Sequence, residues 1–418
     1  MRLMEDMIIG RLSSLDQAMI DERMEKLVQE TEDPYAHEPK RSPYLIVHSD
    51  QPMNAETPEK YLTESYLTPT GLFYIRHHHP VPLILQNDLE HFKLEIDVSS
   101  FVEGGKIAIS MDQIKALPKV EIDATLQCSG NRRGDMNQYQ RTSGTAWGQG
   151  AISNARWGGA RLLDVLKLAG LDDPFTIANK DGTEKHVCFE SLDGMHASIG
   201  MEKATNPYGD VILAYEMNGE PISRDHGFPL RVIVPGYAAV RNVKWVNKIR
   251  LSESEAEGVW QRGLNYKTLP PNVRDANSVD LKAMPSMTET SVFSGITDVD
   301  LVHHDDEYKP GETVVVHAKG WAWAGGGRNI VRVDITGNDG VSWTSATITD
   351  GQNQKYGRAW AWVFWESEVE AVVNHDGKIK LASKAVDHAF NSQPENVCGL
   401  WNVRGLGNNT WHKVERVV

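Results

Sequence analysis

Residues 125–136 read TLQCSGNRRGDM: a cysteine ends an apolar run and is followed by Ser-Gly-Asn and two adjacent arginines. The residues before it, EIDATLQ, predict a strand that delivers Cys128 to a loop at its end. Arg132 and Arg133 supply positive charge that favours the thiolate, the form of cysteine that binds metals or attacks electrophiles. The same residues also fit a buried structural cysteine beside two surface arginines, and the local sequence alone favours this second interpretation.

The composition narrows the class of protein. The 418 residues carry a formal net charge of −14, which disfavours nucleic acid or an anionic membrane as the main partner. The three cysteines, Cys128, Cys188 and Cys398, include no CxxC pair, so neither a disulfide framework nor a zinc ribbon is predicted. No apolar run approaches the roughly 20 residues of a membrane span. The sequence leaves the compartment open, because the mitochondrial intermembrane space and the cytoplasm are both compatible with it.

The pattern along the chain predicts three parts. Residues 1–33 carry apolar side chains at near-helical spacing and predict a helical arm or linker. Residues 34–282 mix short strands with helices and predict an α+β domain. Residues 286–418 alternate apolar and polar positions between glycine-containing turns, which is typical of an immunoglobulin-like β-sandwich. The expected strands are 91–98, 119–128, 229–237 and 243–251 in the first domain and 312–323, 324–336, 341–348, 358–366 and 378–386 in the second, and the expected helix is 159–171, with Gly170 as its stop.

Longer motifs carry a resemblance to a known family. TLQCSGNRR is followed, nineteen residues after the cysteine, by Trp147 in WGQGAISNARWGGARLLDVL. The further motifs are FYIRHHHPVP (73–82), VCFESLD (187–193), ILAYEMNGEPISRDHGFPLRVIVPG (212–236), VRNVKW (240–245), GWAWAGGGRNIVRVDI (320–335), RAWAW (358–362), KAVDHAFNSQPE (384–395) and LWNVRG (400–405). In order and spacing they resemble the sulfite oxidase family, which includes the assimilatory nitrate reductases. The resemblance covers almost all of residues 34–418 and is closest to animal sulfite oxidases.

The resemblance implies an enzyme that uses molybdopterin with one molybdenum per chain. In this family a cysteine sulfur ligates molybdenum beside the two dithiolene sulfurs of the pterin, and Cys128 takes that position; soft sulfur ligands suit the metal. The implied catalytic and substrate-binding residues are Cys128, Arg76, Arg133, Trp147, Tyr215 and Arg404. Arginine suits such a site because its planar, permanently charged fork matches an oxyanion.

The HHH run at residues 77–79 invites a zinc interpretation. Side chains alternate in an extended segment, so His77 and His79 are expected on one face and His78 on the other, and no HExxH or cysteine partner accompanies them. Zinc is therefore not predicted. The resemblance instead assigns the run to the pterin, with His78 as the cofactor-binding histidine and His77 in place of an asparagine. The full set of implied cofactor contacts is Tyr74, Arg76, His77, His78, Cys128, Asp193, His226, Arg231, Asn242 and Lys244.

Two positions bear on the substrate. Arg404 stands where nitrate reductases of the family carry methionine, so it points to sulfite. Ser143 stands four residues before Trp147, where sulfite oxidases usually place a lysine or arginine. The missing charge predicts weaker sulfite affinity or a different small oxyanion, unless Arg141 compensates. The implied reaction is oxidation of sulfite to sulfate by oxygen-atom transfer; reduction of nitrate or another small molecule is the alternative among enzymes, and a catalytically inactive dimeric scaffold is the alternative outside them.

The resemblance also implies partners. The C-terminal domain has a family role in dimerisation, so a homodimer is expected, with no nucleic acid and no membrane span. Animal relatives carry an N-terminal haem domain with an HPGG motif, and this motif is missing from the sequence. No haem is therefore expected in this chain, and electrons are expected to pass to an external acceptor, cytochrome c or oxygen, unless the chain is a truncated form.

Overall fold

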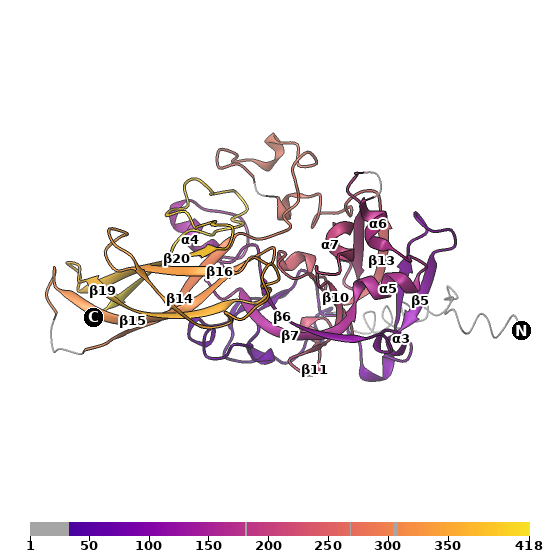
Figure 1. The fold of residues 1–418 in the computed structure, drawn as a ribbon, viewed down its shortest axis with the longest axis horizontal. Coiled ribbons are helices and arrows are strands. Elements are labelled where there is room, and N and C mark those ends of the chain that lie inside the picture. The colour runs from indigo at the N-terminus through magenta and orange to yellow at the C-terminus, as the bar shows by residue number, and fades with distance from the viewer. Residues whose placement is uncertain (1–32, 180–181, 268, 304–307) are drawn as a thin grey trace, which may run out of the picture.

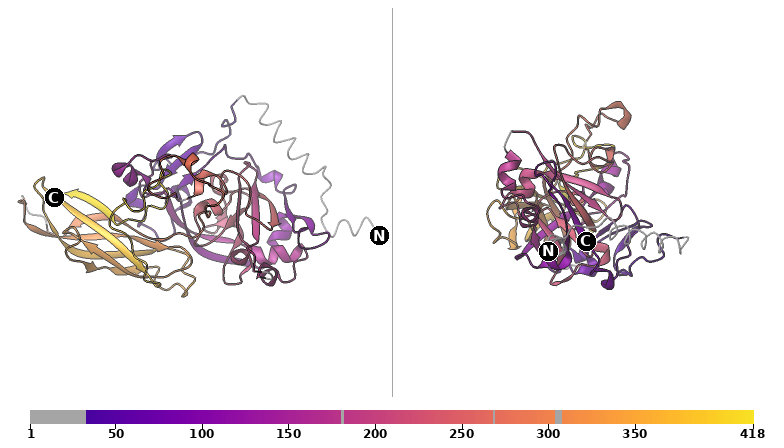
Figure 2. Two further views of the ribbon diagram at one scale, coloured as in Figure 1. Left: turned by 90° about the horizontal axis from the view of Figure 1, so that it is seen from above. Right: turned by 90° about the vertical axis from the view of Figure 1, so that its right-hand side faces the viewer.

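The structure, a computed structural model, describes residues 33–179, 182–267, 269–303 and 308–418. The arm predicted over residues 1–33 lies, except for its last residue, outside the described residues. The molecule is elongated: the strands of the C-terminal part lie together at one end, and most of the short helices and of the other strands lie toward the opposite end (Figures 1 and 2). Within the described ranges, no helix combines the length and the apolar character needed to cross a membrane.

The N-terminal part is built from three sheets. Its strands are β1 Ile46–Asp50, β2 Met53–Glu56, β3 Ile75–Arg76, β4 Lys93–Asp97, β5 Lys106–Ser110, β6 Lys119–Gln127, β7 Ile152–Arg161, β8 His186–Ser191, β9 His196–Gly200, β10 Ile212–Met217, β11 Glu220–Pro221, β12 Arg231–Ile233 and β13 Val246–Ser252. The sheet orders are β1-β2-β3, then β11-β10-β7-β6 with β12 paired to β10, then β5-β4-β13-β8-β9. Among these described pairings only β4 with β13 is parallel, so the sheets suit the α+β class predicted from the sequence.

The helices are short. They are α3 Met111–Lys115, α4 Arg133–Tyr139, α5 Leu162–Leu168, α6 Pro174–Asn179 and α7 Met201–Thr205, with 3₁₀ turns η1 Glu59–Tyr61, η2 Thr70–Leu72, η3 Gln86–Asp88, η4 Arg224–His226, η5 Ala239–Arg241, η6 Leu264–Tyr266 and η7 Ala276–Ser278. The helix predicted over residues 159–171 is confirmed as α5, although it is shorter because β7 continues to Arg161. Gly170 follows its end with a φ of +90°, a left-handed conformation that glycine adopts without steric cost.

The C-terminal part is a sandwich of two four-stranded sheets. Its strands are β14 Val292–Leu301, β15 Thr313–Ala324, β16 Ile330–Thr336, β17 Thr344–Ser345, β18 Thr347–Asp350, β19 Val363–Val372, β20 Lys378–Asp387 and β21 His412–Val417. The orders are β14-β15-β19-β18 and β17-β16-β20-β21. Ile296 and Val316 of one sheet share a fully buried core with Ile335 and Leu381 of the other, which confirms the predicted sandwich. The domain boundaries predicted at residues 282 and 286 stay predictions.

The strand predicted over residues 358–366 is wrong in its first half. β19 begins only at Val363, because the backbone before it is used for side-chain contacts. The N–H of Ala361 donates to Gln354 Oε1 at 2.8 Å, and that of Trp362 donates to Thr125 Oγ1 of β6 at 2.9 Å. This segment therefore joins the sandwich to the strand that leads to Cys128.

The sheet that contains β6, β7 and β10 separates two cores. Ala214 of β10 packs in the core that contains Cys128, together with Leu126 and Trp157. The next residue, Tyr215, packs on the opposite face, in the core shared with the β4–β13 sheet. Alternation along β10 therefore decides which of its side chains can approach the cysteine.

Candidate active site

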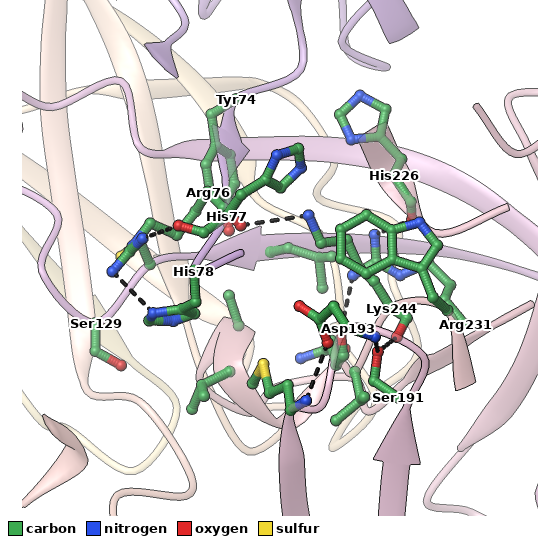
Figure 3. A pocket seen from close by; sticks show the side chains of 18 of the residues that line it. Tyr74, Arg76, His77, His78, Ser129, Ser191, Asp193, His226, Arg231 and Lys244 are labelled. Carbon is green, nitrogen blue, oxygen red and sulfur yellow. Dashed lines mark hydrogen bonds between the residues drawn. The ribbon is translucent and has the colours of Figure 1, made fainter. Parts of the chain in front are cut away.

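Two neighbouring cavities meet at the end of β6, and Cys128 lines both of them. The cofactor cavity, as we name the first, is lined by all ten predicted cofactor contacts: Tyr74, Arg76, His77, His78, Cys128, Asp193, His226, Arg231, Asn242 and Lys244. The anion cavity, as we name the second, is lined by five of the six predicted catalytic residues: Arg76, Cys128, Arg133, Trp147 and Arg404. Figure 3 shows side chains from distant segments pointing into the cofactor cavity.

The loop after β6 holds Cys128 in place. β6 pairs with β7 over nine residues and becomes fully buried in its last four, so the strand enters the core as it approaches the cysteine. The Cys128 N–H donates to the Ala151 carbonyl at 2.9 Å, and its own carbonyl accepts from the Asn131 N–H at 2.9 Å. Cys128 is buried, as the structural interpretation expected, but it lines two cavities instead of being sealed in hydrocarbon.

Buried bases form one wall of the cofactor cavity. Lys244 Nζ donates to the carbonyls of Asp225 at 3.0 Å and Arg76 at 3.3 Å. Arg231 donates to the carbonyls of His226 at 2.8 Å and Asn242 at 2.9 Å. Burial lowers the pKa of Lys244 well below its usual value, with a further contribution from Arg231, and burial lowers the pKa of Arg231 to about 10. An anion beside these two bases would stabilise their charged forms, so this wall favours an anionic ligand.

The buried histidines act as neutral groups. Burial, with Lys244 nearby, lowers the pKa of His226 to about 3, and burial with Arg76 nearby lowers the pKa of His78 to about 2. His226 Nε2 lies 3.2 Å from the Thr70 carbonyl, and His78 Nε2 lies 3.2 Å from the Tyr266 hydroxyl. These rings therefore serve as hydrogen-bonding groups of the wall and add no charge to it.

The predicted alternation along the histidine run is wrong. β3 ends at Arg76, so the run follows the strand and does not continue it. His78 and His79 both contact the Trp260 ring, at centroid distances of 5.6 and 5.3 Å, whereas His77 packs against Trp245 on another side. His78 is consequently free to line both cavities, and only His77 is fully buried.

One described group of side chains, Glu38, His77 and Asp225, has ligand atoms close enough together to hold a metal ion. Arg41 already fills the space between its carboxylates: its guanidinium is ion-paired with both Glu38 and Asp225. The His77 Nε2 atom lies 3.1 Å from the Asp225 carbonyl. The carboxylates of the group are therefore already ion-paired with Arg41, and zinc at the histidine run stays without support.

Several buried polar atoms in the cavity walls lack a hydrogen-bond partner among the described residues. In the cofactor cavity they are Ser129 Oγ, Arg231 Nε and His77 Nδ1. Buried polar groups are normally paired, so these atoms indicate a ligand with several polar groups. Asp193 is the single carboxylate among the described residues that line this cavity. A phosphate-bearing pterin would meet the unpaired donors and the buried bases, so the residues present fit the cofactor implied by the resemblance.

The Arg133 side chain reaches the anion cavity by packing directly against glycine residues. Its Nε donates to the Arg404 carbonyl at 2.9 Å and its Nη1 donates to the Thr145 carbonyl at 2.6 Å. A Cβ added at Gly405 would lie 2.6 Å from Arg133 Cγ, and one at Gly144 would lie 3.1 Å from Arg133 Cζ. Both glycines also have positive φ values, 59° and 117°. Only residues without side chains leave room for the arginine there.

Arg132 does something different from its neighbour. Its guanidinium donates to the carbonyls of Thr410 at 2.7 Å and Trp411 at 3.0 Å and is ion-paired with Asp135 at 2.8 Å. Its own carbonyl accepts from Asn408 at 2.8 Å, and it is buried. Arg132 therefore clamps the cysteine loop to the C-terminal segment, and the surface position that the structural interpretation gave it is wrong.

The remaining walls of the anion cavity carry unpaired donors. Trp147 is fully buried, and its Nε1 has no partner in the described part of the chain. The same holds for Arg404 Nε. Arg76 is the last residue of β3, and its Nη1 donates to Asn54 Oδ1 at 2.9 Å. Three guanidinium groups from distant segments thus line one cavity beside a thiol.

The placement of Tyr215 in the pocket requires correction. Tyr215 lines neither cavity, because alternation along β10 turns it into the core on the far side of the sheet. Tyr266, at the end of η6, lines both cavities and is buried. Tyr266, Asn265 and Ser129 were not predicted from the sequence. The first two lie in the single 3₁₀ turn η6, which is too short to show a periodicity, and the only indication for Ser129 was its place beside Cys128.

Ser143 contacts the wall of the anion cavity through Arg404, although Ser143 itself does not line the cavity. Its Oγ accepts a hydrogen bond from Arg404 Nη1. Arg141, which was considered as a replacement for the missing charge, is exposed and does not line the cavity. The structure therefore gives no compensating cation at this position within its described residues.

Comparison with protein families and known proteins agrees with this arrangement. Residues 78–260 match the family described as an oxidoreductase molybdopterin binding domain, and residues 282–417 match the Mo-co oxidoreductase dimerisation domain. The chain is 42% identical to human mitochondrial sulfite oxidase over 394 residues, covering 92% of this chain and 68% of the relative. It is 39% identical to Arabidopsis thaliana sulfite oxidase, covering 91% of this chain and 95% of the relative.

A solved structure shares the fold. The sulfane dehydrogenase SoxCD from Paracoccus pantotrophus superimposes with a TM-score of 0.67 at 24% identity, covering 93% of this chain and 95% of that one. At this identity the likeness concerns the arrangement of the sheets and not the reaction.

Proposed function

The chain belongs to the sulfite oxidase family of molybdopterin oxidoreductases, and on that basis we propose that it oxidises sulfite to sulfate where the two cavities meet, with electrons passed to an external acceptor such as cytochrome c or oxygen. The observation that carries the proposal is the convergence of Arg76, Arg133 and Arg404 beside Cys128. The described residues that line the anion cavity include no carboxylate, so nothing there competes with a small oxyanion for the guanidinium groups.

The cofactor cavity is the place we propose for molybdopterin with one molybdenum per chain. Cys128 would hold the metal, and Arg231, Lys244 and the unpaired Ser129 hydroxyl would hold the anionic pterin. When bound, the cofactor supplies the oxygen-atom transfer and accepts two electrons. The other residues of the predicted cofactor set keep their proposed roles in this cavity, and a chain without haem stays a prediction.

The residues of the anion cavity supply charge and orientation. Arginines keep their charge when they are buried, so they can hold sulfite and sulfate in a site that excludes water. The unpaired Trp147 Nε1 can donate to a substrate oxygen. We assign to Tyr266 the role first expected of Tyr215: its hydroxyl, paired with His78, lies in the shared wall and can donate a hydrogen bond or move a proton there.

We also propose that the protein is a homodimer formed through residues 286–418. The support is the match of residues 282–417 to a dimerisation domain. The measurement is the molar mass of the purified protein in solution. A mass of one chain at micromolar concentration would contradict this part of the proposal.

The experiment on function is metal analysis followed by turnover. Purified protein should contain close to one molybdenum per chain and should reduce cytochrome c or ferricyanide when sulfite is added. Bound molybdenum with activity only on nitrate, supplied with a reduced dye, would replace sulfite oxidation by nitrate reduction. Protein prepared with an active cofactor pathway that holds no molybdenum would support the inactive scaffold.

A further inference from the structure

We propose that Ser143 and Asn265 are positioning residues for Arg404, and that this neutral pair sets the affinity of the anion cavity for a doubly charged oxyanion. The inference rests on the proposed function, because it takes the occupant of the cavity to be sulfite or its product sulfate. It concerns the two acceptors that hold the two terminal nitrogens of the Arg404 guanidinium group.

Both contacts are direct. Arg404 Nη1 donates to Ser143 Oγ, and Arg404 Nη2 donates to Asn265 Oδ1 at 3.0 Å. The third nitrogen, Nε, is buried without a partner among the described residues. Arg404 and Asn265 both line the anion cavity. The guanidinium is therefore fixed by two neutral oxygens, while one of its nitrogens, Nε, keeps its N–H without a protein partner in the described part of the chain.

The backbone around Arg404 is fixed separately. The Ser143 N–H donates to the Val403 carbonyl at 2.8 Å, and Arg133 Nε donates to the Arg404 carbonyl at 2.9 Å. Nearby, Trp401 Nε1 donates to the Gln140 carbonyl at 2.8 Å. With the main chain held, the freedom that remains is rotation of the long Arg404 side chain, and this is what the two side-chain acceptors restrict.

The neutrality of the two acceptors matters for binding. A carboxylate at either position would hold the guanidinium at least as well, but it would also neutralise the charge that an oxyanion needs. A lysine at position 143 would add charge but would repel Arg404. Serine and asparagine orient the group and leave its charge available. Ser143 lies outside the cavity lining and Asn265 lies within it, and both are predicted to control affinity through the Arg404 guanidinium that they hold.

The test is a double-mutant cycle on the dissociation constant of sulfate, measured by titration calorimetry on purified, metal-analysed protein. Ser143→Ala and Asn265→Ala should each raise this constant by about threefold to tenfold, the effect of losing one ordinary hydrogen bond. In an Arg404→Ala background the same substitutions should change it by less than twofold, because their target is gone. A merely structural role would give the same change in both backgrounds.

Two further variants sharpen the test. Ser143→Thr keeps the hydroxyl and should restore wild-type binding, whereas Asn265→Asp keeps the acceptor but adds charge and should weaken sulfate binding more than Asn265→Ala does. In turnover, the alanine variants should raise KM for sulfite and leave kcat within about twofold. The matched control is Asn277→Ala, an exposed asparagine outside both cavities, which should change neither constant.

The outcomes separate this inference from the proposed function. Sulfite turnover by the wild type with additive effects in the cycle would overturn the positioning role and leave the function standing. Coupled effects on sulfate binding without sulfite turnover would support the positioning role and contradict the function. Tighter binding by Asn265→Asp than by Asn265→Ala would also overturn the inference.

Discussion

The two cavities differ in which parts of the chain build them. The walls of the cofactor cavity come from residues 73–266, within the N-terminal part. The anion cavity has an additional wall, Arg404 and Leu406, which the C-terminal part supplies. The difference teaches that one folded part can complete the pocket assigned to the pterin, whereas the site assigned to the substrate exists only when both parts are packed together.

The cavities also hold their cations in different ways. Lys244 and Arg231 donate to backbone carbonyls in the wall of the cofactor cavity, and burial lowers the pKa of both. Arg404 is only partly buried and is held by the side chains of Ser143 and Asn265. The first arrangement suits a permanent ligand, and the second suits one that enters and leaves in every cycle.

The strongest way to break the comparison is to remove the thiol that both cavities share. Cys128→Ser should lower sulfite turnover by at least about a thousandfold, or about 4 kcal/mol of barrier, because the metal loses its protein ligand. Steady-state kinetics and molybdenum analysis are the measurements. Cys398→Ser, at an exposed cysteine outside both cavities, should behave as the wild type. Comparable losses in the two variants would remove Cys128 from its assigned place.

Arg132 tests whether the two parts must stay packed. Arg132→Ala should reduce the free energy of unfolding by about 3 kcal/mol, because the buried carbonyls of Thr410 and Trp411 lose their donor. Thermal unfolding and hydrogen exchange over residues 402–412 are the measurements. The exchange should become faster in this segment. The loosened segment should also weaken sulfate binding more than it weakens pterin binding.

The control for Arg132 is an arginine in an exposed pair. Arg156→Ala removes the ion pair with Asp123, and its effect on stability should stay below about 1 kcal/mol. Equal destabilisation by the two substitutions would mean that Arg132 does not clamp the C-terminal segment.

Arg404 should separate the two cavities. Arg404→Met removes charged hydrogen bonds and should raise KM for sulfite by about tenfold to a hundredfold, which corresponds to about 1.5–3 kcal/mol. The molybdenum content should be unchanged, since the cofactor cavity does not include this residue. Arg141→Ala, on the same loop as Ser143, should leave KM unchanged. A loss of molybdenum in the Arg404 variant would show that the cavities are not separable.

Acidic pH should destabilise the C-terminal part of the protein through protonation of His412. Its Nδ1 accepts from the Ile296 N–H at 2.9 Å, and burial with Arg132 nearby lowers its pKa well below the usual value. The unfolded state therefore binds more protons below pH 6.5, so the stability that this neutral ring contributes is present above pH 6.5 and lost as the pH falls below it. The slope is at most about 1.4 kcal/mol per pH unit.

The measurement is the free energy of unfolding between pH 7.5 and 5. His412→Gln should show a shallower slope than the wild type, and His375→Gln, at an exposed histidine, should show the wild-type slope. Identical slopes in all three proteins would contradict the assignment to His412.

Much of the cofactor cavity could be predicted because its residues follow regular elements or long motifs. Cys128 directly follows β6, whose β-rich composition is readable; Arg231 begins β12, and Asp193 and Lys244 lie two residues from the ends of β8 and β13. The prediction that Tyr215 lies in the pocket was wrong although Tyr215 lies in a regular strand, because a motif does not reveal which face of β10 a residue occupies. Tyr266 could not be predicted from the local sequence, since it ends the short 3₁₀ turn η6, which only tertiary packing brings to Cys128. Arg132 and Arg133 are neighbours in the sequence, and the local sequence likewise could not show that the first contacts the C-terminal segment while the second lines the anion cavity.

The wall common to the two cavities has an energetic consequence. Arg76, His78, Cys128 and Tyr266 face both spaces, so whatever fills one changes the electrostatic field and the rotamers met by whatever fills the other. Linkage then requires reciprocity: the factor by which molybdopterin tightens sulfate equals the factor by which sulfate tightens molybdopterin. Excess sulfate should accordingly raise the affinity of the protein for the pterin, an effect to which Arg404 would contribute although it lines only the anion cavity.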